Sequence, residues 1–261
     1  MDSPYLSPLI VLLGVLAVLV GASEIGFRLG RRAGLKDEAF RTQLGVIRSA
    51  TFAMVAFLIA FAFSSAGTRY IDRLDMIVRE ANAIGTSYLR TGVLAEPQRS
   101  ELQGILRQYA AGRLELLGSY GQSNVAPLLA KATTTQNRMW NVALLAVKDD
   151  PLLTWTLLPP LNDVIDLHAA HLATARRHTP LPILVVLVGC AALAFGLVGF
   201  ANGLAHRRFP VLTGIYGIVM VVSLWMTIDL DRPRHGLIRA SEQPFVDLVA
   251  SMGAVPPPAG R

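Results

Sequence analysis

The residue types best suited to chemistry in this sequence are two histidines and a nearby carboxylate, at His168, His171 and Asp163. The histidines stand three positions apart, so they share one face of a helix, and Asp163 precedes them by little more than one turn. Two imidazoles and a carboxylate are ligands that zinc accepts. No fixed third ligand or Glu-bearing motif such as H-E-x-x-H accompanies them, so we expect no metal site.

The sequence also lacks the short motifs of the common enzyme classes. It contains no G-x-S-x-G, no Walker loop, no G-x-G-x-x-G and no clustered Cys/His spacing. The single cysteine, Cys190, cannot form an intrachain disulfide or a cysteine-based metal cage. We therefore expect no enzymatic activity and no cofactor.

Composition points to a lipid environment. Of 261 residues, 52% are hydrophobic and only 16% are charged, whereas soluble domains carry roughly 25% charged residues. This composition excludes an ordinary soluble globule and, because it is so apolar, a disordered chain. The formal net charge is +6, and in an apolar chain such an excess indicates contact with anionic lipid headgroups rather than nucleic acid.

Four stretches without charge are as long as the ~20 residues that a helix needs to cross a bilayer. They lie between Asp2 and Glu24, Arg48 and Arg69, Arg177 and Arg207, and Arg208 and Asp229. Their apolar residues are continuous rather than alternating, which indicates helices and not barrel strands. We predict transmembrane helices over about 6–26, 49–67, 181–203 and 209–228.

These spans predict an all-α membrane protein with four transmembrane helices in two hairpins and an inserted helical domain between the second and third spans. The first hairpin occupies 1–68, the polar helical domain 69–177, the second hairpin 178–229, and a C-terminal extension with a disordered tail 230–261. Helical periodicity runs through the insert, and its first helix should continue directly from the second span. We expect helix breaks near Pro97, around Gly118–Pro127, at Asp150-Pro151 and at Pro159-Pro160.

The second span carries an aromatic stripe. Phe57 and Phe61 form an i,i+4 pair, and Ser64 continues the same face. In a ring of subunits this stripe would line a pore and form a hydrophobic constriction that gates by dewetting. Lipid contact or packing against a neighbouring helix suits phenylalanine equally well, and we favour that simpler interpretation from the residues alone.

Charged residues gather where the second and fourth spans leave the membrane: Arg69, Arg73, Asp229, Asp231 and Arg232. One interpretation places them at a pore mouth, where the carboxylates collect cations or hold the arginines so that they attract anions. The other interpretation, which we favour, pairs the carboxylates with Arg69 or Arg73 to join the ends of the helices.

Two further features favour structural roles. Gly189, Ala192 and Gly196 recur in the third span at the spacing that lets membrane helices approach closely. Glu24 closes the first span with Arg28 one turn later, an arrangement typical of an interfacial ion pair rather than of an intramembrane functional carboxylate.

Three segments indicate a protein family more specifically than hydropathy does. They are ASEIGFRLGRR from Ala22 to Arg32, RYIDRLDMIVREANAIGTSYLR from Arg69 to Arg90, and DLDRPRHGLI from Asp229 to Ile238. The chain resembles the bestrophin-like domain family of prokaryotic integral membrane proteins in these segments and in its paired hairpins. The positions that carry this resemblance are Glu24, Glu80, Asn82, Arg90, Pro233 and Gly236. For Glu80 and Asn82, the structural alternative is that they cap or bridge helices of the insert.

The family is named for its similarity to bestrophins, which are pentameric anion channels with a cytosolic helical region between two hairpins. The resemblance therefore implies a homo-oligomeric channel for small inorganic ions, multi-pass in the inner or plasma membrane, with termini and insert inside. The positive-inside rule weakly favours the opposite orientation, because short basic loops weigh more than long domains. The dense acidic calcium-binding run of animal bestrophins is missing, so calcium gating is not implied. A non-conducting scaffold or sensor, whose insert binds a partner, is the alternative function.

Overall fold

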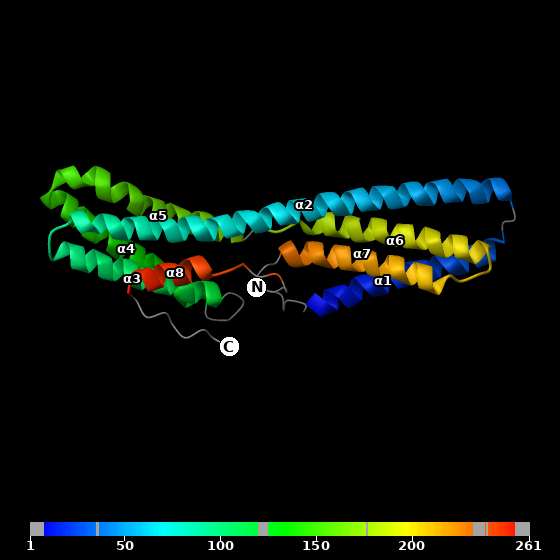
Figure 1. Ribbon diagram of the computed structural model, residues 1–261. Coiled ribbons are helices and arrows are strands. Elements are labelled where there is room, and N and C mark those ends of the chain that lie inside the picture. Colours follow the sequence, from blue (N-terminus) through cyan, green and yellow to red (C-terminus); the bar gives the residue numbers. More distant parts are fainter. Residues whose placement is uncertain are drawn as a thin grey trace. The chain divides into compact units, whose positions relative to one another are not determined.

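A computed structural model describes residues 8–34, 37–119, 125–175, 177–231, 238 and 240–253. This part of the chain is helical and contains no strand, which confirms the predicted all-α class (Figure 1). The helices are α1 (Pro8–Ala33), α2 (Glu38–Arg90), α3 (Gln98–Gly118), α4 (Val125–Asp149), α5 (Thr154–Ala175), α6 (Leu181–Leu204), α7 (Pro210–Asp231) and α8 (Gln243–Ser251), with short 3-10 helices η1 (Thr91–Val93) and η2 (Pro151–Leu153).

Four of the described helices, α1, α2, α6 and α7, are long and apolar enough to cross a membrane. Their ranges overlap the four stretches in which the sequence predicts spans. Only 17% of the most apolar stretch of α1 and of α2 is buried, and 28% of that of α6 and of α7. Most of this apolar surface therefore faces outward, which is the arrangement expected of helices solvated by lipid.

The chain divides into two compact units. The apolar unit comprises Met1–Tyr70 and His178–Ile238, and the polar unit comprises Ile71–Arg177 and Arg239–Arg261. Helix α2 runs unbroken for 53 residues and contributes to both units (Figure 1). The predicted continuation of the second span into the polar segment is thus observed, because neither proline nor a capping motif interrupts the helix.

Helices α1 and α6 of the apolar unit pack backbone against backbone. A Cβ atom added at Gly26 or Gly30 would collide with the backbone of α6, and one added at Gly199 or Gly203 would collide with that of α1. These are two G-x-x-x-G pairs, a spacing that lets membrane helices approach closely. Of the predicted stripe, Gly196 lies at this contact, since a Cβ added there would be 3.7 Å from the carbonyl oxygen of Ala22, whereas Gly189 has no neighbour within 4 Å of an added Cβ.

Helix α2 contributes side chains to the core of the apolar unit. The buried residues of this core come from all four long helices: Val15, Leu19, Val55, Ile59, Ala62, Leu187, Ala191, Ala194, Phe195, Met220, Val221 and Leu224. Phe52 of α2 lies edge-on to Phe195 of α6 and to Tyr216 of α7, with ring centroids 6.4 and 4.7 Å away. Edge-to-face rings at such separations stabilise packing beyond the area that they bury.

The polar unit has its own apolar core, to which α8 contributes. Phe245 and Val249, an i,i+4 pair on α8, are fully buried in this core. This helix lies in the segment expected to form a C-terminal extension, where no helix was predicted. A helix of 9 residues is marginal in isolation, so its apolar contacts with the rest of the unit must stabilise it.

The predicted helix breaks occur at Pro97, between Gly118 and Val125, and at Pro151, but α5 continues through Pro159 and Pro160. A proline at 160 cannot donate the usual hydrogen bond to the carbonyl of Thr156. Arg90 Nη1 donates to that carbonyl instead, at 3.3 Å, and Ser87 Oγ donates to the carbonyl of Pro160 at 3.0 Å. Arg90 thus replaces the donor that Pro160 lacks, and Ser87 fastens α5 to α2 at the same turn. Helix α5 continues through both prolines, so the predicted break there is wrong.

Candidate functional site

The aromatic stripe on α2 is uncovered within the chain. Phe57 and Phe61 are 69% and 70% exposed, and Ser64 is exposed on the same face. Val55 and Ile59, on the opposite side of the helix, are buried at 0% and 7% exposure. Packing inside one chain therefore does not explain the phenylalanines, and they are available to lipid or to another subunit.

The charged cluster at the end of the spans is built around Arg69 and Asp231. Arg69 Nε donates to Asp231 Oδ1 at 2.8 Å, Nη1 donates to Ser65 Oγ at 2.7 Å, and Nη2 donates to Thr179 Oγ1 at 2.6 Å. The backbone N–H of Thr179 donates to Asp231 Oδ2 at 2.7 Å. Asp231 thus ties the end of α7 to α2 and to the residues that precede α6.

The other predicted members of this cluster have different surroundings. Asp229 is buried, and its Oδ2 accepts a hydrogen bond from the backbone N–H of Ile238 at 3.1 Å. Arg73, in the polar unit, is also buried and donates from Nη2 to the carbonyl of Arg177 at 2.6 Å. Arg232, Pro233 and Gly236 lie outside the described residues.

Glu24 stands at the opposite end of the apolar unit. It accepts a hydrogen bond from Arg28 Nε at 2.9 Å, as the spacing predicts. It also accepts hydrogen bonds from Arg208 Nη1 and Nη2 at 2.9 and 3.3 Å. The Arg208 guanidinium carbon lies 4.1 Å from the centroid of the Phe27 ring. Glu24 therefore fastens α1 to the turn between α6 and α7, a contact that local spacing could not predict.

Glu80 lies at the centre of a buried polar cluster in the polar unit. Its carboxylate accepts two hydrogen bonds from Arg113 of α3, from Nε to Oε1 and from Nη2 to Oε2, the latter at 2.8 Å. Nδ1 of His171, on α5, is 2.7 Å from Oε2. Because an ionised carboxylate only accepts, His171 must carry its proton on Nδ1. Glu80 and Arg113 are both 0% exposed.

Two more groups complete this cluster. His168 Nδ1 is 3.5 Å from Glu80 Oε1, an ion-pair distance rather than that of a well-formed hydrogen bond. Phe245 of α8 faces Arg113, with the guanidinium carbon 6.0 Å from the ring centroid. Burial would raise the pKa of Glu80, but the neighbouring His168 and the hydrogen bonds from His171 and Arg113 outweigh it and hold the pKa well below its ordinary value.

The histidine pair thus has a different partner from the one that the sequence suggested. Asp163 is exposed, while Glu80 occupies the position beside both rings. Among the described residues, no group of three His, Cys, Asp or Glu side chains is arranged to hold a metal ion. Sequence reasoning missed Arg113, although an arginine continuing the apolar stripe of Leu106 and Tyr109 on α3 was a detectable signal.

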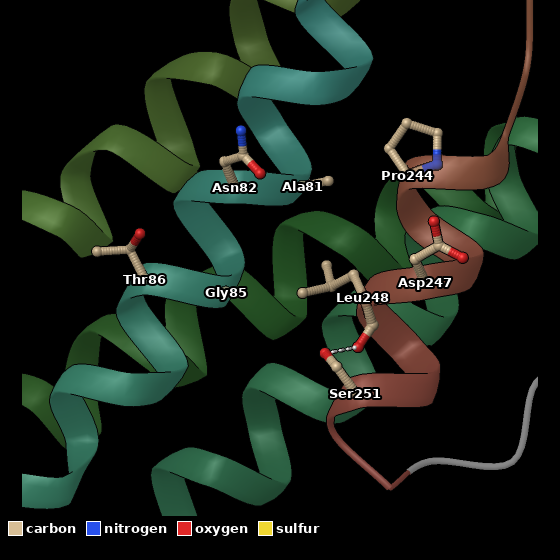
Figure 2. A pocket seen from close by; sticks show the side chains of 8 residues that line it. All are labelled: Ala81, Asn82, Gly85, Thr86, Pro244, Asp247, Leu248 and Ser251. Atoms are coloured by element: carbon tan, nitrogen blue, oxygen red, sulfur yellow. Dashed lines mark hydrogen bonds between the residues drawn. The ribbon is translucent and has the colours of Figure 1, made fainter.

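Asn82, another family-motif residue, borders a groove between α2 and α8 (Figure 2). The groove has a volume of about 730 Å³, with Ala81, Asn82, Gly85 and Thr86 on one wall and Pro244, Asp247, Leu248 and Ser251 on the other. A Cβ at Gly85 would lie 3.3 Å from Leu248 Cδ1, so glycine lets α8 approach α2 here. Asn82 is exposed at the groove, and Arg90 compensates for Pro160 as described above.

Comparison with known proteins identifies the family. A search of curated proteins found no match. The fold resembles the crystal structure of a bacterial bestrophin homolog from Klebsiella pneumoniae, with a TM-score of 0.58 and 15% sequence identity over 95% of this chain and 99% of that one. The model of the Bestrophin-like domain matches residues 13–245, nearly the whole chain including all four apolar helices. The chain is therefore a member of the Bestrophin-like domain family of membrane proteins.

Proposed function

We propose that this protein is one subunit of an oligomeric ion channel in the plasma membrane, in which α2 lines the pore with Phe57, Phe61 and Ser64. The chain crosses the bilayer four times, as two hairpins with the helical domain 69–177 inserted between them. The observation that carries this proposal is the exposed phenylalanine stripe on a membrane-length helix of a bestrophin-like chain. A ring of such helices would place hydrophobic rings around a central path.

Oligomerisation is a requirement of this proposal. In the described part of the chain, the four apolar helices are packed through glycines and through aliphatic and aromatic side chains. A conducting path must therefore form between copies of the chain, on surface that one copy leaves exposed. The uncovered face of α2 meets that condition.

Anion preference follows from the family resemblance and the net positive charge of +6. Arg69 contributes less to it than its position suggests, because Asp231 compensates its charge. We assign Arg69 and Asp231 first to holding α2, α6 and α7 together at one end of the spans. Their influence on ions at a pore mouth is secondary.

The test is ion flux through purified protein in liposomes, combined with its mass in detergent. Phe61→Ala should increase anion flux several-fold, because it widens a hydrophobic constriction. Phe63→Ala is the matched control, since Phe63 is exposed but lies two positions away, on another face of α2. A monomeric protein without flux would rule out the channel, and equal effects of both variants would rule out this pore face.

A non-conducting scaffold or sensor is the second candidate. The groove between α2 and α8 favours it, because exposed polar side chains border an open depression in the polar unit (Figure 2). Crosslinking from a cysteine at Thr86 in cells distinguishes the two functions. A scaffold should give one reproducible partner protein, whereas contacts with other copies of this chain alone would count against it.

A further inference from the structure

A second groove, in the apolar unit, has a polar end and an apolar body. It lies between α2 and the beginning of α6 and has a volume of about 300 Å³. The polar end consists of Ser65, Arg69 and Thr179, and the body is aliphatic and aromatic: Leu58, Phe61, Ala62, Pro180, Pro182, Ile183, Val186 and Leu187. The groove is therefore amphipathic along its length.

The surroundings of the groove determine what fills its apolar body. Both walls belong to helices of membrane length whose surfaces are mostly exposed. Water needs two to four polar partners, and the aliphatic and aromatic lining of the body does not supply them. Hydrocarbon needs no such partners, and a bilayer supplies it in excess.

The polar end of the groove retains hydrogen-bond donors. Within the described part of the chain, the bonds from Arg69 to Asp231, Ser65 and Thr179 use three of the five guanidinium N–H groups. Two N–H groups remain for another acceptor. The Thr179 hydroxyl oxygen accepts from Arg69, so its own O–H remains a donor as well. A guanidinium with an adjacent hydroxyl is well suited to phosphate oxygens.

We propose that this groove binds one glycerophospholipid. An acyl chain lies along the apolar body beside Ala62 and Val186, and the phosphodiester accepts hydrogen bonds from Arg69 and Thr179. The Arg69–Asp231 pair is formally neutral, so hydrogen bonding and chain burial, rather than net charge, hold the lipid. This inference rests on the membrane location of the chain and not on conduction. Phe61 also borders this groove, so the lipid is tested with variants at Val186 and Thr179, which leave the phenylalanine stripe unchanged and keep the result separate from channel activity.

The acyl-chain contact is tested with a variant that fills the groove. Val186→Trp places a large ring in the body of the groove, whereas Val185→Trp places the same ring beside it. Val186 and Val185 are 57% and 61% exposed, so neither substitution disturbs the core. Phospholipid that remains bound after extensive detergent washing is measured by native mass spectrometry. Wild type and Val185→Trp should retain about one phospholipid per chain, and Val186→Trp should lose it at least several-fold.

The phosphate contact is tested with lipids of the same acyl chains. Delipidated wild-type protein is incubated with phosphatidylglycerol or with diacylglycerol, which has no phosphate. Only phosphatidylglycerol should remain bound, and Thr179→Val should weaken its retention. The proposal is wrong if wild type retains no lipid, if Val186→Trp retains as much as Val185→Trp, or if diacylglycerol binds equally well. If Val186→Trp instead dissociates the oligomer while lipid content is unchanged, a second copy of the chain occupies the groove.

Discussion

Glu80 shows how one residue can join four helices of the polar unit. Its carboxylate contacts Arg113 of α3 and both histidines of α5, and Phe245 of α8 lies against the same guanidinium. Removing one member of a buried ion pair leaves the other charged and desolvated, which costs more than the pair itself contributes. The cluster therefore makes the packing of these helices mutually dependent.

We predict strong coupling between Glu80 and Arg113. Glu80→Gln or Arg113→Met alone should destabilise the folded protein by about 3–5 kcal/mol, the usual consequence of breaking a buried pair. The double variant should lose much less than the sum of the two. Thermal unfolding in detergent, followed by tryptophan fluorescence, gives this comparison. Glu101→Gln is the control, because the ion pair of Glu101 with Arg138 is exposed and contributes at most about 1 kcal/mol. If the stability losses of Glu80→Gln and Arg113→Met simply add in the double variant, the coupling is contradicted.

The same residue predicts a pH dependence. The pKa of Glu80 is lowered from its ordinary value of 4.5, so the unfolded chain takes up a proton on acidification before the folded protein does. The stability that Glu80 contributes is present above pH 4.5 and declines as the pH falls below it. The stability difference between wild type and Glu80→Gln should therefore shrink between pH 5 and pH 3, as measured by unfolding at each pH. A constant difference would show that the carboxylate is not ionised in the fold.

The sequence predicted some of these side-chain contacts and not others. The i,i+4 pair of Glu24 and Arg28 was predictable because both residues lie on one helix. The contacts of Glu80 were not, because Arg113 and His171 are 33 and 91 positions away, and only the packing of separate helices brings them together. Spacing along the chain placed His168 and His171 on one face correctly but could not reveal which carboxylate faces them.

At the scale of elements, the close packing of α1 on α6 is the most sensitive feature. Gly26→Ala or Gly199→Ala would force the two backbones apart, at a cost of about 1–3 kcal/mol for overpacking. We expect a lower unfolding temperature and lower yield of folded protein in detergent for both variants. Gly189→Ala is the matched control, since an added Cβ there meets no atom within 4 Å. A loss at Gly189 equal to that at Gly26 would contradict backbone-to-backbone packing.

The long apolar helices were predictable because hydrophobicity over about 20 residues is a strong local signal. The third and fourth spans were predicted at 181–203 and 209–228, and α6 and α7 cover Leu181–Leu204 and Pro210–Asp231. Helix α8 and the unbroken α5 were not predictable in this way. Their stability depends on contacts with distant segments: Phe245 is buried in the core of the polar unit, and Arg90 donates to the carbonyl that Pro160 leaves free.

For the whole molecule, the central question is which side of the membrane the polar unit occupies. The family resemblance implies the cytosolic side, and the short basic loops favour the opposite side. We predict the cytosolic side. Four crossings would then place the exposed residue Ser100, between the second and third spans, on the side opposite to the exposed Ala205 in the α6–α7 turn. A cysteine at each position, with Cys190→Ser to remove the native thiol, reports the side directly.

Labelling of these two variants with a membrane-impermeant maleimide in right-side-out spheroplasts should give reciprocal results. Ala205→Cys should react in intact spheroplasts, and Ser100→Cys should react only after permeabilisation. The reverse pattern would keep four crossings and show that the basic loops, rather than the family layout, set the orientation. Equal reactivity of both cysteines from one side would place the polar unit and the α6–α7 turn together. A single crossing by α6 would put these two regions on opposite sides of the membrane. Helix α6 could therefore not be a transmembrane helix.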